Sequence, residues 1–182
     1  KSIDALSSAT GLAGDETAQA IAQILNVTGE AQSNVVGVSS VIAELGNTTA
    51  TTEEQIVHFA KRLATDTKTA KLTSAEVLGI ASSMAEMGLQ AEGASTVIGR
   101  TFRFIEDAVK GGGKAMEDLQ RITGQTEAEI QQAFGEDKVA LFSSFVGGIS
   151  RVQDSGETLN SILSDMGIKS DENARILGLL SQ

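Results

Sequence analysis

Side chains that could perform acid–base or metal chemistry are scarce in this chain. Its 182 residues include one histidine, His58, and no cysteine. On a helix, His58 would lie beside Glu54 and Arg62 and away from Phe59, so we interpret it as a solvated residue and not as a catalytic base. A zinc site would need several clustered carboxylates, and no such spacing occurs. We therefore predict that the chain is not an enzyme and has no catalytic, cofactor-binding or metal-binding residue.

Two short segments superficially resemble ligand-binding loops. Residues 110–114 read Lys-Gly-Gly-Gly-Lys, but a phosphate-binding loop has Gly, four residues and Gly-Lys-Ser/Thr after a buried strand. Here Ala115 follows the second lysine and a helix is expected before the glycines, so nucleotide binding is not predicted. Asp165–Asp171 lacks the alternating oxygen ligands and the distal glutamate of a calcium-binding EF-hand. Asn26 and Asn47 begin glycosylation sequons, which we interpret as turns at helix ends.

The charge balance excludes several kinds of partner. The chain has 24 acidic and 14 basic residues, which gives a net charge of −10. A duplex DNA-binding protein needs a basic stripe to neutralise phosphates, and an acidic chain is disfavoured on anionic lipid, so we predict no direct nucleic-acid binding. The uncharged runs Ala31–Ala43 and Val139–Ser150 are shorter than the roughly 20 residues that cross a bilayer. We predict buried helices there and no membrane span in this segment.

Apolar residues recur at helical spacing along almost the whole chain, and strand-like alternation is nearly absent. Side chains at i, i+3, i+4 and i+7 share one face, which must be buried against another helix. These stripes comprise Ala18, Ile21, Ala22 and Leu25; Ile56, Phe59, Ala60 and Leu63; Val77, Ile80, Ala81 and Met84; Ala94, Val97, Ile98, Phe102, Ile105 and Val109; Phe142, Phe145, Ile149 and Val152; and Leu159, Ile162, Leu163 and Met166.

One run, residues 35–38, could also form a strand. However, Val35, Val38, Ile42 and Leu45 make a better helical stripe. The chain has no proline, so long helices are permitted anywhere. Aromatic residues make up only 3% of it, so its core must be built mainly from Ala, Val, Ile, Leu and Met. The sequence therefore predicts an all-α fold, a multi-helix bundle of about ten short capped helices with no sheet.

The ends of these helices are marked by specific residue types. Capping boxes, in which a Thr hydroxyl and an acid or amide three residues later satisfy free N–H groups, are expected at Thr52/Gln55, Thr73/Glu76 and Thr126/Glu129. Ser170 and Asp171 are expected to open the last helix. Left-handed C′ glycines followed by an apolar residue are expected at Gly11-Leu12, Gly88-Leu89 and Gly167-Ile168, and further helix ends at Gly29, Gly46 and Gly124.

Other glycines lie inside the expected helices, where each costs about 1 kcal/mol relative to alanine. They are Gly79, Gly93, Gly99, Gly147, Gly148 and Gly178. We interpret them as points of close helix–helix approach within the chain. The alternative is that they form a seam for self-association.

The domain organisation follows from the lack of a long linker. We predict that residues 1–182 form a single α-helical domain, with a possible subdivision into 1–110 and 114–182 at a hinge formed by Gly111–Gly113. The chain begins with Lys1 and has no apolar signal segment, so we expect it to be a fragment of a longer protein.

The order of these turns resembles a known family. The relevant segments are Ala9–Leu12 through Asn26–Gly29, then Val41–Asn47, then Leu72–Val77 through Met87–Ala94, followed by a long helix with Arg100 and Phe102, and later Ile122–Glu127 and Leu163–Ile168. Together they resemble the conserved domain of the N-terminal half of phage tail tape measure proteins. Each motif is generic helix punctuation, and the specificity comes from the order and spacing of the motifs over nearly the whole chain.

The resemblance implies a structural component of phage or prophage tail assembly, which sets tail length and acts in tube assembly and DNA delivery. Implied partners are tail tube subunits, tail assembly chaperones, tail tip or baseplate proteins, and other copies of the chain. The implied location is the virion tail, and the host cytoplasm during assembly. The alternative function is a cellular helical adaptor or scaffold that mediates protein–protein interaction, and a weaker one is a small helical enzyme with a carboxylate pair in a cleft.

Overall fold

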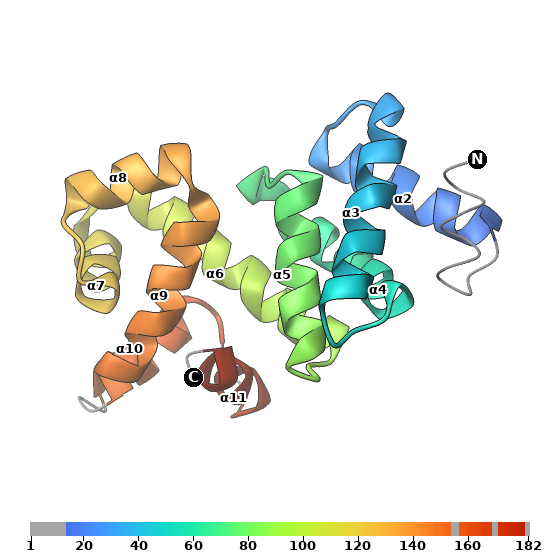
Figure 1. The fold of residues 1–182 in the computed structure, drawn as a ribbon. Coiled ribbons are helices and arrows are strands. Elements are labelled where there is room, and N and C mark those ends of the chain that lie inside the picture. The colour runs from blue at the N-terminus through green and yellow to red at the C-terminus, as the bar shows by residue number, and fades with distance from the viewer. Residues whose placement is uncertain (1–13, 154–156, 169–170, 181–182) are drawn as a thin grey trace. The chain divides into compact units, whose positions relative to one another are not determined.

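The computed structural model describes residues 14–153, 157–168 and 171–180, and within these ranges the regular structure is helical throughout. Ten α-helices and two short 3₁₀ helices are present there, without any strand (Figure 1). In chain order they are α2 Gly14–Thr28, η1 Gln32–Asn34, α3 Val35–Thr48, α4 Glu53–Asp66, η2 Lys68–Ala70, α5 Ser74–Glu86, α6 Ala91–Gly111, α7 Gly113–Thr123, α8 Glu127–Glu136, α9 Lys138–Gln153, α10 Glu157–Asp165 and α11 Asp171–Leu180. The all-α prediction is confirmed.

Contacts between residues divide the chain into two compact units. Unit 1 comprises Lys1–Thr96 and unit 2 comprises Val97–Gln182, so the boundary falls inside α6. The glycines at 111–113 instead form the junction between α6 and α7, where Gly112 and Gly113 have φ angles of 63° and 59°. A hinge at these glycines stays a prediction.

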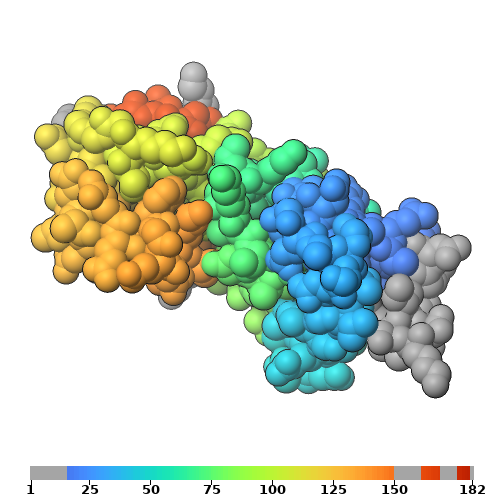
Figure 2. All heavy atoms as spheres, turned by 90° about the horizontal axis from the view of Figure 1, so that it is seen from above, coloured from blue at the N-terminus to red at the C-terminus, as the bar shows by residue number. Residues whose placement is uncertain are grey.

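Unit 1 is organised around the pair α4 and α5. Helix α2 packs on α4, and α3 packs on both α4 and α5. The core is aliphatic, and its largest fully buried side chains are Ile21, Ile24, Leu25, Ile42, Ile56, Leu63 and Leu78. Figure 2 draws the heavy atoms of this unit's described residues in blue to green and shows one outer face of the unit.

Unit 2 is organised around α9, on which α7, α8, α10 and α11 all pack. Four of its five phenylalanines meet in two pairs: Phe102 stacks on Phe142 with ring centroids 5.0 Å apart, and the ring centroids of Phe104 and Phe145 lie 5.8 Å apart. The run Val139–Ser150 therefore contributes buried side chains, as predicted for it. No described helix is both long enough and apolar enough to cross a bilayer.

The predicted helix ends are largely confirmed. All three capping boxes form: in the first, the Gln55 N–H donates to Thr52 Oγ1 (3.2 Å) and the Thr52 N–H donates to Gln55 Oε1 (3.0 Å). Four of the proposed terminating glycines, Gly29, Gly88, Gly124 and Gly167, have left-handed φ angles of 69° to 78°. Helix α11 begins at Asp171 as expected. Gly11-Leu12 and Ser170 lie outside the described residues.

Three details of the prediction are wrong. Gly46 does not end a helix, because α3 continues to Thr48, and a Cβ at Gly46 would meet the Glu53 side chain at 2.5 Å. The run Ala31–Ala43 is not a buried helix: it includes η1, and within α3 the buried side chains are limited to three positions. Gly79 and Gly147 do not mark close helix approaches, since a Cβ there would meet nothing within 4 Å.

Candidate functional site

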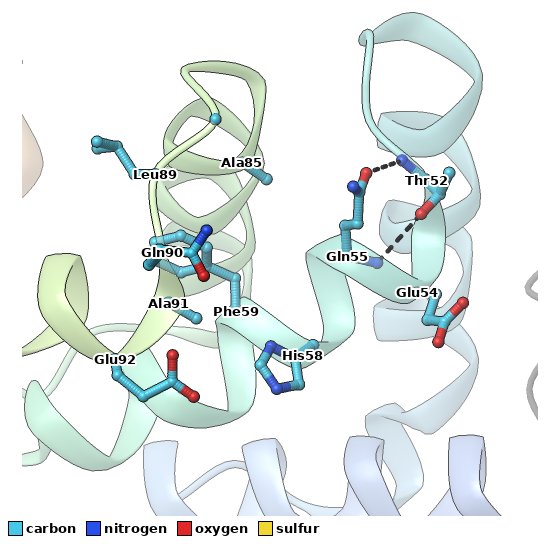
Figure 3. A pocket seen from close by; sticks show the side chains of 11 residues that line it. Thr52, Glu54, Gln55, His58, Phe59, Ala85, Leu89, Gln90, Ala91 and Glu92 are labelled. Carbon is cyan, nitrogen blue, oxygen red and sulfur yellow. Dashed lines mark hydrogen bonds between the residues drawn. The ribbon is translucent and has the colours of Figure 1, made fainter.

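One hollow in unit 1 is a groove between α4 and the turn that joins α5 to α6. Its volume is about 510 Å³. It is lined by Thr52, Glu54, Gln55, His58, Phe59, Ala85, Gly88, Leu89, Gln90, Ala91 and Glu92, and Figure 3 shows this lining on α4, at the end of α5, in the turn that follows α5 and at the start of α6. We call it the α4–α6 groove.

Each wall of the groove is fixed by a helix end that the sequence specifies. On one side, the Thr52/Gln55 capping box starts α4, so the next turn projects Glu54 and His58 outwards (Figure 3). On the other side, α5 ends at Gly88, whose φ of +69° is accessible to glycine at little cost. The Leu89 N–H then donates to the Met84 carbonyl at 3.2 Å, which turns the chain into α6.

The groove has a mixed polar and apolar lining and a charged rim. Phe59 and Ala91 are buried below it, and Leu89 is half-buried. Glu54 and His58 on α4 and Glu92 on α6 are exposed. No side-chain hydrogen bond or ion pair links any of these three to another described residue. The groove therefore offers a mixed polar and apolar surface that includes two carboxylates without a partner among the described residues.

A second hollow of about 340 Å³ adjoins the groove on the other side of α4. It lies against α2, and Glu16, Gln19, Gln23 and Lys61 contribute to its lining together with Glu54 and His58. His58 is thus part of a ridge between two hollows, exposed to solvent as predicted. The described residues hold no group of three or more His, Asp or Glu side chains placed to bind a metal ion.

Unit 2 contains a hollow of about 410 Å³ with a different chemistry, lined mainly by α6 and α7 and by the end of α10. Its basic residues largely serve the fold. Lys114 Nζ donates to Asp118 and Asp165, at 3.0 Å each, and Arg100 donates to the carbonyl of Gly167. Arg121 also pairs with Asp118, whose side chain is 3% exposed. Hydrogen bonds with Asp165 and Asp118 raise the pKa of Lys114 above its ordinary value.

These contacts account for the lysines of the Lys-Gly-Gly-Gly-Lys segment. Lys110 pairs with Glu106 one turn earlier on α6, at 2.5 Å, and Lys114 lies between two aspartates. The segment joins two helices and follows no strand. Its lysines therefore hold neighbouring acids, and the loop does not have the architecture that cradles a phosphate.

Sequence reasoning did not single out Glu54, Gln90 or Glu92 as parts of a site. Each is an exposed polar residue on a helix or turn, and neither the capping box around Glu54 nor the turn that contains Gln90 and Glu92 indicates a groove. Only the packing of α4 against α5 brings residues 54 and 92 to the same groove. Gly88-Leu89 is the part of the groove that the sequence did indicate.

Comparison with known proteins adds the remaining evidence. Residues 1–167 match the model of a family described as phage-related minor tail protein. No curated protein and no solved structure matches the chain significantly. The family match spans most of the 182 residues and includes the helices that form the groove. The chain therefore belongs to the phage-related minor tail protein family.

Proposed function

We propose that this chain is a structural segment of a phage tail tape measure protein and that it acts by binding other tail proteins, not by catalysis. The observation that supports this most directly is the family match over residues 1–167. The order of capped helices and glycine turns supports the finer assignment, because it resembles the conserved domain of tape measure proteins. A family of tail proteins also favours this role over that of a cellular adaptor.

The proposed partners are tail tube subunits, tail assembly chaperones and tail tip proteins, with the virion tail as the final location and the host cytoplasm as the site of assembly. The geometry is suited to binding: the two hollows beside α4 are open, their floors are partly apolar and their rims are polar. Such surfaces can be covered by another polypeptide with little rearrangement of the helices around them.

We also propose that the segment enters assembly as a folded unit. One continuous helix of 182 residues would extend about 270 Å at 1.5 Å per residue. The chain instead has short helices with specified ends, and each of its two units has its own buried core. A folded segment of this kind adds much less length per residue than an extended helix.

In-frame deletion within the full-length gene tests the proposal. Removing residues 97–182 leaves unit 1 intact, and tails are then measured by electron microscopy and their proteins identified by mass spectrometry. A tape measure segment predicts that tails fail to assemble or change in length, and an extended helical ruler would shorten them by roughly 130 Å. Infectious tails of normal length that carry the shortened protein would overturn the proposal.

A further inference from the structure

We propose that the α4–α6 groove binds a basic segment of a partner protein. In this arrangement, lysine or arginine side chains of the partner pair with Glu54 and Glu92, and an apolar side chain covers Phe59 and Leu89. The inference rests on the geometry of unit 1 alone and holds whether or not the chain sets tail length.

The carboxylates of Glu54 and Glu92 lack a role in the fold. Some other acids on the surface have one: Asp66 pairs with Arg62, and the carboxylates of Glu76 and Glu129 accept hydrogen bonds in capping boxes. Glu54 and Glu92 are exposed, and neither side chain contacts a described donor. Exposed carboxylates on opposite walls of one groove can both reach cations on a ligand that lies between them.

The groove also exposes some apolar surface, including that of Leu89. Phe59 is 3% exposed, and Leu89 is half-buried beside it. Met87, in the same turn, is 50% exposed, which is high for a large apolar side chain. Protein-binding surfaces usually combine apolar and polar groups.

The site is open and extends across α4. The groove of about 510 Å³ adjoins the hollow of about 340 Å³, and the two share Glu54 and His58. Together they run across α4 from α2 to the start of α6, and the second hollow adds a third exposed carboxylate, Glu16, and one exposed lysine, Lys61. A surface that crosses a helix in this way suits a polypeptide segment better than an enclosed small molecule.

The sign of the charge decides between possible occupants. Residues 1–96 contain eleven Asp and Glu against five Lys and Arg, and the whole chain has a net charge of −10. A nucleic acid would be repelled from this groove, and a second acidic copy would be disfavoured there for the same reason. A segment rich in Lys or Arg would be attracted, and this complementarity would also speed its association.

Peptide binding to the complete 182-residue chain tests the proposal. The probe is a blocked 15-residue peptide of Leu and Lys at helical spacing with one Trp, and its counterpart has Glu in place of each Lys. The chain contains neither Trp nor Tyr, so peptide fluorescence reports binding without background. The variant carries Glu54→Gln and Glu92→Gln. The matched control carries Glu44→Gln and Glu117→Gln, which remove two other exposed carboxylates.

We expect the Lys peptide to bind at low ionic strength and the Glu peptide not to bind. The groove variant should raise the dissociation constant of the Lys peptide about fivefold or more, and the control should change it less than twofold. Leu89→Gln should weaken binding as well, because it removes part of the apolar surface. No binding of the Lys peptide, equal binding of both peptides, or equal effects of the groove and control variants would each overturn the proposal.

Discussion

Glu30 links two distant parts of unit 1, and its loss makes a quantitative test of the fold. The residue follows the left-handed Gly29 at the end of α2. Its carboxylate accepts hydrogen bonds from the Ser74 N–H (2.5 Å), the Ser74 hydroxyl (2.9 Å) and the Asn34 amide (2.7 Å). Ser74 is the first residue of α5, so the carboxylate satisfies a free N–H at the positive end of a helix.

The expected magnitude follows from these contacts. A hydrogen bond to a charged group contributes about 1.5–3 kcal/mol when buried, but Glu30 is half-buried and solvent screens part of this. Glu30→Gln keeps one acceptor oxygen and loses both the charge and the second acceptor. We therefore expect it to lower the free energy of unfolding by about 1–2 kcal/mol at pH 7. Each 1 kcal/mol of lost stability should lower the Tm by about 4–8 °C if unit 1 unfolds separately, or by about 2–4 °C if both units unfold in one transition.

The effect should depend on pH in a defined direction. Partial burial raises the pKa of Glu30, but the hydrogen bonds from Ser74 and Asn34 outweigh it, and the net pKa lies below the ordinary value of 4.5. The unfolded chain therefore binds the proton more readily, so the stabilisation is fully present above the ordinary pKa. It is lost as the pH falls through the lower, folded pKa. Thermal unfolding followed by circular dichroism should show the largest difference between wild type and Glu30→Gln at pH 7 and a small one near pH 3.

Glu76→Gln is the matched control at the same end of α5. It removes the same charge, but a capping box accepts glutamine as well as glutamate, as Gln55 does at the start of α4. We expect a change of less than about 0.5 kcal/mol. If the two variants unfold alike, or if the deficit of Glu30→Gln persists at pH 3, the link between residues 30 and 74 does not stabilise the chain in the way argued above.

Two further predictions concern packing in unit 2. Gly148→Ala should lower the free energy of unfolding by about 1–3 kcal/mol, because its Cβ would lie 1.8 Å from the Ile122 carbonyl oxygen. A Cβ at Gly147 would have open space, so Gly147→Ala should stabilise the helix by up to about 1 kcal/mol. Urea unfolding of both variants tests this pair, and a similar loss of stability in both would contradict it. Leu119→Ala removes a side chain with no exposed surface and should cost about 2–5 kcal/mol in the same assay, and a cost below about 1 kcal/mol would mean that this part of the core is not closely packed.

The features that the sequence predicts correctly are those with a local physical cause. A capping box is completed within four residues, so Thr73 and Glu76 specify the start of α5 whatever else the chain does. A left-handed glycine such as Gly88 is equally local. The prediction that Gly46 ends a helix is wrong because glycine also occurs where a neighbouring side chain approaches the backbone closely. Its missing Cβ leaves room for the Glu53 side chain, and α3 continues past it.

The features that the sequence could not predict depend on residues far apart in the chain. The hydrogen bonds between Glu30 and Ser74 span 44 positions, and Arg100 reaches the Gly167 carbonyl over 67 positions. The α4–α6 groove is of the same kind, since Glu54 and Glu92 come from different helices that are separated in the chain. Periodicity gives the buried face of each helix, but it does not give the partner of that face.

An extended helical ruler and a folded domain differ in free energy. To become one long helix, the chain would have to move Gly29, Gly88, Gly124 and Gly167 out of the left-handed conformation and into helix interiors, at about 1 kcal/mol each relative to alanine. That cost is modest. The larger cost is exposure of the core, because burying one large aliphatic or aromatic side chain contributes about 1.5–3 kcal/mol and both units bury many of them. An extended form of this segment would therefore need other polypeptides to cover its apolar stripes, so we expect the isolated chain to remain folded and any extension to depend on tail partners.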